Sequence, residues 1–285
     1  MNKSPLNYIG NKYQILDQLL PLFPKDINTF IDLFMGGGDV ITNIEAKEKI
    51  GIDINTYLTD ILQALKDTTP EDTFAFIEKR IDEFNLTKEN ELGYLKYRDA
   101  YNTNPTYHTP LDLYTLSRFS FHFTIRFNSD LQMNAGFGRG FSNFSSRQRK
   151  TIKPFQEALQ DIEIRNIDFR NLVLNNFKEN DFIYADPPYL ITNNVYNNGL
   201  KLVGQKWNEK DEKDLLAFLD TANSIGIKFT LSNVLHHRGK TNKILEEWLI
   251  KNEYNVHKIE TSYSHCTHTV DQKDPPSLEI VVTNY

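Results

Sequence analysis

The stretch "DFIYADPPYLI", residues 181–191, constrains the fold more than any other part of this chain. Four apolar or aromatic residues come before an aspartate, two prolines and a tyrosine. Proline cannot donate a hydrogen bond to a sheet ladder and biases the preceding residue away from helix, so a buried strand has to end here. Open α/β sheets bind their ligands at the carboxyl ends of parallel strands. We therefore expect Asp186 and Tyr189 at a ligand-binding edge.

A second predicted strand is followed by a cluster of glycines. "NTFIDLFMGGGDV" is typical of a short strand over about 29–34, a turn at 36–38 and a helix that begins near Asp39 or Val40. The next apolar segment, "KIGIDINTYL", predicts a strand that ends at Asp53. A glycine cluster is often only a tight turn and a strand-end aspartate is a common helix cap. Together, however, they match the arrangement that binds the ribose of a nucleoside cofactor.

The chemistry of this loop distinguishes among nucleoside cofactors. It lacks Gly-Lys-Ser/Thr, so no lysine would hold a triphosphate, and it is not G-x-G-x-x-G, which makes a dehydrogenase the second choice. Asp39, directly after the third glycine, makes the helix start a poor site for pyrophosphate. S-adenosylmethionine carries a sulfonium and an amino acid group in place of phosphates. Asp32 and Asp39 would suit such a positively charged ligand.

Asp186-Pro187-Pro188-Tyr189 predicts chemistry on an amine. The exocyclic amine of adenine is a weak nucleophile because its lone pair is delocalised, so a catalyst has to accept its two N–H groups. The Asp186 carboxylate and the Pro187 carbonyl are candidate acceptors, and Tyr189 offers a face on which a base can stack. The alternative is a plain turn, and "KDPPSL" at 273–278, which follows a polar stretch and has no aromatic residue, predicts one.

Positive charge is concentrated in the segment 126–153. The chain has a net charge of −6, yet this segment has six basic residues and one acidic residue, a local charge of +5, which leaves −11 for the rest. Phenylalanines and glycines are interleaved with the basic residues. A solvated basic loop is the plain alternative, but the aromatic and glycine residues favour nucleic acid binding.

Strand and helix signals alternate on both sides of a helical block. Helical periods run from Tyr57 to about Ile125, so we predict a catalytic domain made of 1–55 and 160–285, with a helical target-recognition domain inserted at 56–159.

Later segments complete the predicted sheet. "DIEIRNIDF" predicts a half-buried strand ending at Asp168, and helices are expected over about 210–224 and 240–251, on either side of the strand "IKFTLSNV". "NVHKIETSY" and "LEIVVTNY" are joined without a helix and are expected to pair antiparallel at one edge. The predicted fold class is α/β, a Rossmann-like, mostly parallel sheet.

In this order the motifs resemble those of the DNA adenine-N6 methyltransferases of the alpha group, the Dam-like class. "SPLNYIGNKYQIL" is similar to the N-terminal cofactor motif of that family, "DLFMGGGDV" to its glycine motif, "GIDIN" to its ribose acid, "NIDF" to its adenine-side strand end and "DPPY" to its catalytic motif. The resemblance covers nearly the whole chain. It implies S-adenosylmethionine binding by Tyr8, Lys12, Asp32, Phe34, Gly36, Gly38, Asp53, Asp168, Phe169 and Asp186. It also implies catalysis by Asp186, Pro187, Pro188 and Tyr189.

The insertion carries target recognition in that family. "RFNSDLQMNAGFGRG" resembles its DNA-contacting segment. Members that read GATC commonly have Asn-Val-Pro before Phe-Gly-Arg, where this chain has Asn134-Ala135-Gly136, so the recognition sequence stays open. The candidate DNA-binding residues are Arg126, Asn128, Asn134, Phe137, Gly138, Arg139, Arg147, Arg149 and Lys150.

The resulting hypothesis is a methyltransferase that acts on N6 of adenine in double-stranded DNA by base flipping. It would serve as the modification component of a restriction system, with any restriction endonuclease paired only functionally, or as a solitary or phage methylase. The alternatives are an RNA adenine or protein glutamine methyltransferase, or a non-catalytic DNA-binding protein on the same scaffold.

Other sequence features concern the cellular location of the protein and the possibility of a metal site. The start lacks an apolar run like a signal peptide, no membrane-spanning run occurs and Cys266 is the single cysteine, which together predict a cytoplasmic protein. No metal is expected, because His265, Cys266 and His268 have no second ligand cluster. His236 and His237 are expected on a loop.

Overall fold

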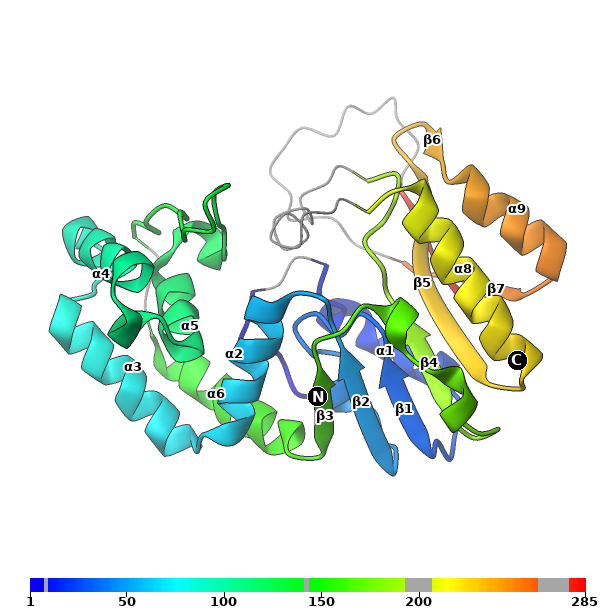
Figure 1. Cartoon of the computed structure of the whole chain (residues 1–285), viewed down its shortest axis with the longest axis horizontal. Helices are drawn as coiled ribbons and strands as arrows, with labels where there is room; N and C mark the ends of the chain where they lie inside the picture. Colours follow the sequence, from blue (N-terminus) through cyan, green and yellow to red (C-terminus); the bar gives the residue numbers. More distant parts are fainter. Residues whose placement is uncertain (8–9, 141–143, 193–206, 261–276) are drawn as a thin grey trace.

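The fold is an open sheet flanked by helices, with a helical block beside it (Figure 1). The computed structural model describes residues 1–7, 10–140, 144–192, 207–260 and 277–285. Within these ranges an eight-stranded sheet has the order β3-β2-β1-β4-β5-β8-β7, with β6 paired to β5. The strands are β1 (Thr29–Asp32), β2 (Glu48–Ile52), β3 (Ile162–Arg165), β4 (Phe182–Ala185), β5 (Lys228–His237), β6 (Lys240–Thr241), β7 (Asn255–Lys258) and β8 (Leu278–Thr283).

The order of the strands places a crevice between β1 and β4. Strands β1 to β5 pair in parallel, whereas β8 is antiparallel to both β5 and β7, which confirms the predicted mostly parallel sheet with an antiparallel edge. The chain moves outward from β1 through β2 to β3, then returns to the other side of β1 for β4 and β5. Ligands bind at such a reversal, beside the carboxyl ends of the two strands.

Both faces of the sheet are covered because neighbouring side chains on a strand point in opposite directions. On one face Ile31 and Ile183 share a core with α8 (Glu209–Ser224) and α9 (Lys243–Asn252). On the other face Phe30 belongs to a core that includes α1 (Leu16–Leu19) and the helical block. Figure 1 shows α8 and α9 in front of the strands and the helical block at the β3 end of the sheet.

Polar breaks in the sequence become helix caps in the helical block. Thr69 accepts the backbone N–H of Asp72, Thr109 accepts that of Asp112, and each threonine precedes a proline at the first helical position. The helices are α2 (Thr56–Asp67), α3 (Pro70–Phe84), α4 (Glu91–Thr103), α5 (Pro110–Phe119) and α6 (Ser146–Leu159). Both α2 and α6 contact the rest of the block as well as the sheet side, at β3 and η3 (Ile41–Asn43) respectively. The division into two domains stays a prediction.

Some local expectations are wrong. The strand expected to end at Asp168 is β3, which ends at Arg165. The helix expected after the glycine turn is only the 3-10 turn η3, because the N-terminal segment bonds to this region: Asn43 accepts the backbone N–H of Asn2, and Asp39 accepts that of Ser4. The end of the basic segment is helical, and Ser145 and Gln148 form a capping box at the start of α6. The other 3-10 helices are η1 (Tyr13–Ile15), η2 (Leu20–Leu22), η4 (Pro105–Tyr107), η5 (Phe121–Phe123), η6 (Phe169–Asn171) and η7 (Leu174–Asn176).

The histidine pair also lies elsewhere than expected. His236 and His237 end strand β5 instead of lying on a loop, since β6 pairs with them in a hairpin. The His236 ring bonds to Thr241 at 2.9 Å and the His237 ring to Ser277 at 2.6 Å. Across the described ranges, no helix combines the length and the apolar character needed to cross a bilayer.

Candidate active site at the carboxyl edge of the sheet

A pocket lies at the crevice beside β1, β2 and β4. The glycine turn and the proline pair both line it. The predicted catalytic and cofactor residues in its wall are Lys12, Asp32, Phe34, Gly36, Asp53, Asp168, Phe169, Asp186, Pro187 and Pro188. Gly38 and Tyr189 are buried without forming part of this wall, and Tyr8 lies outside the described residues. Distant segments of the sequence thus meet in one place.

Asp53 shapes the glycine turn. Its carboxylate accepts the backbone N–H of Gly36 at 3.0 Å through Oδ2 and that of Asn55 at 2.8 Å through Oδ1. Gly36 has a φ of 53°, in the left-handed region that glycine adopts without strain. Burial raises the pKa of Asp53 to about 6. Each carboxylate oxygen keeps a lone pair, so Asp53 could also bind a ligand hydroxyl.

Two more carboxyl groups line the pocket near the ends of β1 and the glycine turn. Asp32 is 1% exposed, and its Oδ1 has no hydrogen-bond partner among the described residues. Burial, followed by the charge of Asp186, raises the pKa of Asp32 well above its ordinary value. Burial also raises the pKa of Asp39 to about 6. A cation entering the pocket would favour the ionised forms, so the site suits a positively charged ligand.

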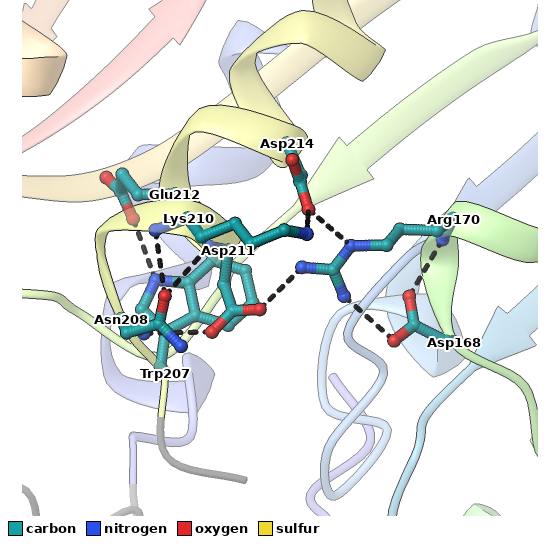
Figure 2. Close-up of polar contacts among 8 residues, drawn as sticks. All are labelled: Asp168, Arg170, Trp207, Asn208, Lys210, Asp211, Glu212 and Asp214. Carbon is teal, nitrogen blue, oxygen red and sulfur yellow. Dashed lines mark hydrogen bonds and ion pairs between the residues drawn. The ribbon is translucent and has the colours of Figure 1, made fainter.

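An aromatic wall faces the same pocket. Phe34 lies 5.5 Å from Phe169 and 5.6 Å from Trp207 between ring centroids. The Trp207 indole N–H donates to Glu212 at 2.8 Å, which fixes the ring relative to α8 (Figure 2). Flat aromatic surfaces of this kind can hold a purine by stacking.

Arg170 connects this wall to α8. Figure 2 shows three carboxylates around its guanidinium, Asp168 from the loop after β3 and Asp211 and Asp214 from α8. The nitrogen–oxygen distances are 2.9 Å to Asp168, 2.5 Å to Asp211 and 2.8 Å to Asp214. The guanidinium also lies 4.7 Å from the centroid of the Phe169 ring. These contacts hold the predicted adenine-side strand end against the pocket.

Asp186 lies at the pocket edge in a network with Lys12, Tyr189 and Glu279. Lys12 Nζ is 2.9 Å from Asp186 Oδ1 and 2.7 Å from the Tyr189 hydroxyl. That hydroxyl is 3.1 Å from the same Oδ1 and 2.9 Å from Glu279 Oε1. Among the described residues, the side-chain contacts of Asp186 therefore fall on Oδ1, which leaves Oδ2 for an incoming group. Burial raises the pKa of Asp186, Lys12 opposes the rise and Glu279 adds to it.

Part of the predicted DNA-binding set forms a hairpin-like loop. Arg126 donates to the Asn134 side chain at 2.9 Å and to its backbone carbonyl at 2.8 Å. The Asn128 side chain accepts the backbone N–H groups of Asp130 and Gln132. These contacts shape the loop and keep the exposed Arg126 at its base.

Phe137 and Gly138 attach the next segment to the helical block. The Phe137 ring lies 5.6 Å from that of Tyr94, and the Gly138 N–H donates to the Phe119 carbonyl at 2.9 Å. Their contacts are thus internal. The exposed Arg139 follows and meets Glu91 at 2.6 Å at the surface.

Three predicted basic residues lie in the first turns of α6. Arg147 and Lys150 are exposed, whereas Arg149 pairs with Glu78 and lies 4.8 Å from the centroid of Phe144. The positive end of a helix dipole adds to their charge. This combination suits a phosphate backbone.

No histidine among the described residues lines this pocket. No group of three or more His, Cys, Asp or Glu side chains able to hold a metal ion occurs in the described part of the chain. His265, Cys266 and His268 lie outside that part.

Sequence analysis did not single out Arg170, Trp207, Asp211 or Glu279. Arg170 directly follows the predicted Asp168-Phe169 pair, so a basic residue beside that motif was a usable signal. Glu279 carries no such signal, since it lies 90 residues after Tyr189 on an apolar strand. Only the pairing of β8 with β5 brings it to the pocket edge.

Comparison with known proteins assigns the family. Modification methylase StsI of Streptococcus sanguinis is 44% identical over 285 residues, and type II methyltransferase M.FokI of Planomicrobium okeanokoites is 43% identical over 286 residues. Each match covers 99% of this chain and 43% of the relative, so the chain spans less than half of their length. The DNA adenine methylase of Escherichia coli is 29% identical over 66% of the chain and 65% of the relative. The model of the D12 class N6 adenine-specific DNA methyltransferases matches residues 8–265, and with the relatives above it places this chain in that family.

Proposed function

We propose that this chain transfers a methyl group from S-adenosylmethionine to N6 of adenine in double-stranded DNA, after the base has flipped out of the duplex. The observation that carries the proposal is the pocket edge itself. There, Asp186 is held through one oxygen beside Asp32, a buried carboxyl whose Oδ1 has no partner among the described residues. A hydrogen-bond acceptor for an amine therefore lies next to an acidic pocket that suits a cation.

The pocket residues fit the cofactor. S-adenosylmethionine supplies an electrophilic methyl group on a positively charged sulfur, and Asp32 is the buried acid that would balance positive charge. Phe34, Phe169 and Trp207 would hold the adenine ring, while Asp53 would accept hydrogen bonds from ribose hydroxyls. We keep Lys12, Gly36, Gly38 and Asp168 in the proposed cofactor site.

Two acceptors would orient the target amine. The Asp186 carboxylate takes one N–H and the Pro187 carbonyl the other, which favours a tetrahedral nitrogen whose lone pair points toward the methyl donor. Pro188 would restrict the backbone of the turn, and the Tyr189 ring is proposed to stack on the base. Because the Lys12 ammonium holds Oδ1, the acceptor is positioned before the base arrives, which lowers the cost of reorganisation.

The helical block would bind the DNA. A polar loop between α5 and α6 contains Arg126, Asn128, Asn134 and Arg139. Helix α6 adds the charges of Arg147, Arg149 and Lys150. Phosphate contacts by α6 would set the register on the duplex, and the loop would read base edges. We propose that Phe137 and Gly138 support this loop from behind.

The names of the StsI and FokI relatives favour a modification role in a restriction system over a solitary one. The experiment is transfer of labelled methyl groups to duplex DNA, followed by methylation-sensitive sequencing of DNA from cells that express the chain. N6-methyladenine at one sequence would support the proposal. Labelling of RNA alone would point to an RNA methyltransferase, and DNA binding without transfer would point to a non-catalytic protein on this scaffold.

A further inference from the structure

Glu279 is a buried acid at the pocket edge that the proposed reaction does not yet use. It lies on β8 with 5% of its surface exposed, opposite Val234 of β5. Its Oε1 is 2.9 Å from the Tyr189 hydroxyl and 3.4 Å from Lys12 Nζ. Both of these groups also hold Asp186.

The Tyr189 hydroxyl is shared between two carboxylates. A phenol has a single proton and can donate it to only one acceptor at a time. The oxygen of Glu279 is the nearer of the two, at 2.9 Å against 3.1 Å for Asp186. When the proton points to Glu279, Asp186 Oδ1 accepts chiefly from Lys12, and the phenol oxygen accepts from the same ammonium at 2.7 Å.

The charges in this network are not balanced. Among the contacts of the described residues, two carboxylates face one ammonium, all three groups are at most 16% exposed at the side chain, and hydrogen bonds are stronger in such surroundings. Glu279 draws Lys12 partly away from Asp186, so Asp186 is not fully neutralised. Among the described residues, the other titratable groups that interact with Asp186 include Tyr184, on the same strand, and Asp32, on β1.

We propose that Glu279 is a positioning residue of the methyl transfer. It takes the Tyr189 proton and shares Lys12, so that Asp186 keeps enough negative charge to accept the target amine strongly. The inference rests on the proposed function, because it assigns Glu279 a part in the same reaction. After methyl transfer the target nitrogen carries a positive charge, and its surplus proton would pass to Asp186 and from there to solvent, so Glu279 itself neither gains nor loses a proton.

Glu279→Gln tests this role because it keeps the side-chain shape and removes the charge. At saturating cofactor and DNA, we expect the single-turnover rate on the pH plateau to fall roughly tenfold, since a fully neutralised acceptor polarises the amine less. The acidic limb of the pH–rate profile should move to lower pH, because the charge of Glu279 raises the pKa of Asp186. Cofactor affinity should not change.

Lys12→Met should move the pH–rate profile in the opposite direction. Removing the ammonium should move the acidic limb to higher pH, because Lys12 lowers the pKa of Asp186. A merely structural role for Glu279 would not displace one limb in opposite directions in the two variants. Asp112→Asn is the matched control, since Asp112 is also buried and bonds a tyrosine hydroxyl and a cation, but in the helical block. Its limb should stay in place.

Glu279→Asp, which keeps the charge, covers the case in which the Gln variant does not fold. It should retain a limb near that of the wild type, and a limb moved to lower pH would overturn the role. A Glu279→Gln protein with the plateau rate and limb of the wild type, beside an inactive Asp186→Ala, would overturn the inference and leave the proposed function intact. Wild-type protein that makes no N6-methyladenine would instead overturn the proposed function.

Discussion

In two buried clusters of this protein an aspartate contacts a basic side chain and a tyrosine hydroxyl, but the surroundings of the two aspartates differ. In the helical block, Asp112 bonds the Arg80 guanidinium at 2.7 Å and the Tyr97 hydroxyl at 2.6 Å through Oδ1, while Oδ2 accepts from Thr109 at 2.6 Å. At the sheet edge, Asp186 bonds Lys12 and Tyr189 through one oxygen.

The two carboxylates differ in how many of their oxygens have hydrogen-bond partners and in how far they are exposed. Asp112 is completely buried and has partners on both oxygens, whereas the Asp186 side chain is 16% exposed in a pocket wall. A saturated buried cluster can stabilise a fold but has no capacity left for a ligand. An acceptor held through one oxygen is already positioned and can still react. The comparison therefore separates a carboxylate with partners on both oxygens from the one that we propose to be functional, although both are aspartates in the sequence.

Asp186→Ala should have the largest effect. We expect methyl transfer to fall by about 10³-fold or more, because the principal acceptor for the amine is removed. Labelled-methyl transfer measures the rate, and calorimetry should show that the cofactor still binds. Undiminished turnover would show that Asp186 is not the acceptor for the target amine, and the two clusters would then be equivalent.

Asp112→Ala should instead act on stability. Removing this carboxylate leaves Arg80 with its partner Glu83 but takes the acceptor from the Tyr97 and Thr109 hydroxyls, so we expect the free energy of unfolding to fall by about 3 kcal/mol. Urea unfolding measures the decrease. Per folded molecule, transfer at saturating DNA should stay close to that of the wild type, and a fall in rate beyond the folded fraction would contradict a purely structural role.

Asp53→Ala should come next, because this carboxylate both shapes the glycine turn and lines the pocket. We expect cofactor affinity to fall roughly tenfold or more, in line with the removal of hydrogen bonds to a charged acceptor. Asp181→Ala is the matched control, since Asp181 also accepts backbone N–H groups, from Thr29 and Lys178, before β4 begins. Calorimetry should show a change in Asp53→Ala alone; equal affinities would remove Asp53 from the site.

The pocket acids should make both stability and binding depend on pH. The pKa values of Asp39 and Asp53 rise from 3.8 to about 6, so the folded chain holds these protons more tightly than the unfolded chain does. These groups therefore lower stability as pH rises through this interval.

A cationic ligand prefers the ionised acids, so its affinity should increase as pH rises through about 6, with release of protons. Calorimetry in two buffers of different ionisation enthalpy counts these protons. S-adenosylhomocysteine, which lacks the sulfonium charge, should show a weaker dependence. An affinity that does not change with pH would contradict the acidic role of the pocket.

The smallest effect is expected at the surface. Arg147→Ala with Lys150→Ala should weaken binding to any duplex several-fold and reduce the slope of log affinity against log salt by about 0.9 for each phosphate that is no longer neutralised. Filter binding over a salt series measures it. Lys251→Ala, an exposed lysine in α9, is the control and should leave the slope unchanged; a double variant with an unchanged slope would exclude α6 from the DNA interface.

The sequence predicted the sheet, its antiparallel edge, and a ligand-binding edge at the carboxyl end of the strand that precedes the proline pair. These follow from local signals, since apolar runs ended by glycine or proline place strand ends, and parallel strand ends share an edge. The errors came where distant segments act on a local pattern. The N-terminal segment bonds the chain after the glycine turn and leaves only η3, and β6 extends β5 through His236 and His237.

By itself, then, the sequence determined the fold class, and it predicted the carboxyl edge as the site with Asp186 as the proposed acceptor, because strand patterning and a proline turn are local properties. Only the tertiary structure decided which oxygen of Asp186 is held and by what. Lys12 comes from the N-terminal segment and Glu279 from the last strand, so their meeting depends on the order of the strands. No spacing in the chain encodes a contact of that kind, whereas the pairing of β8 with β5 produces it directly.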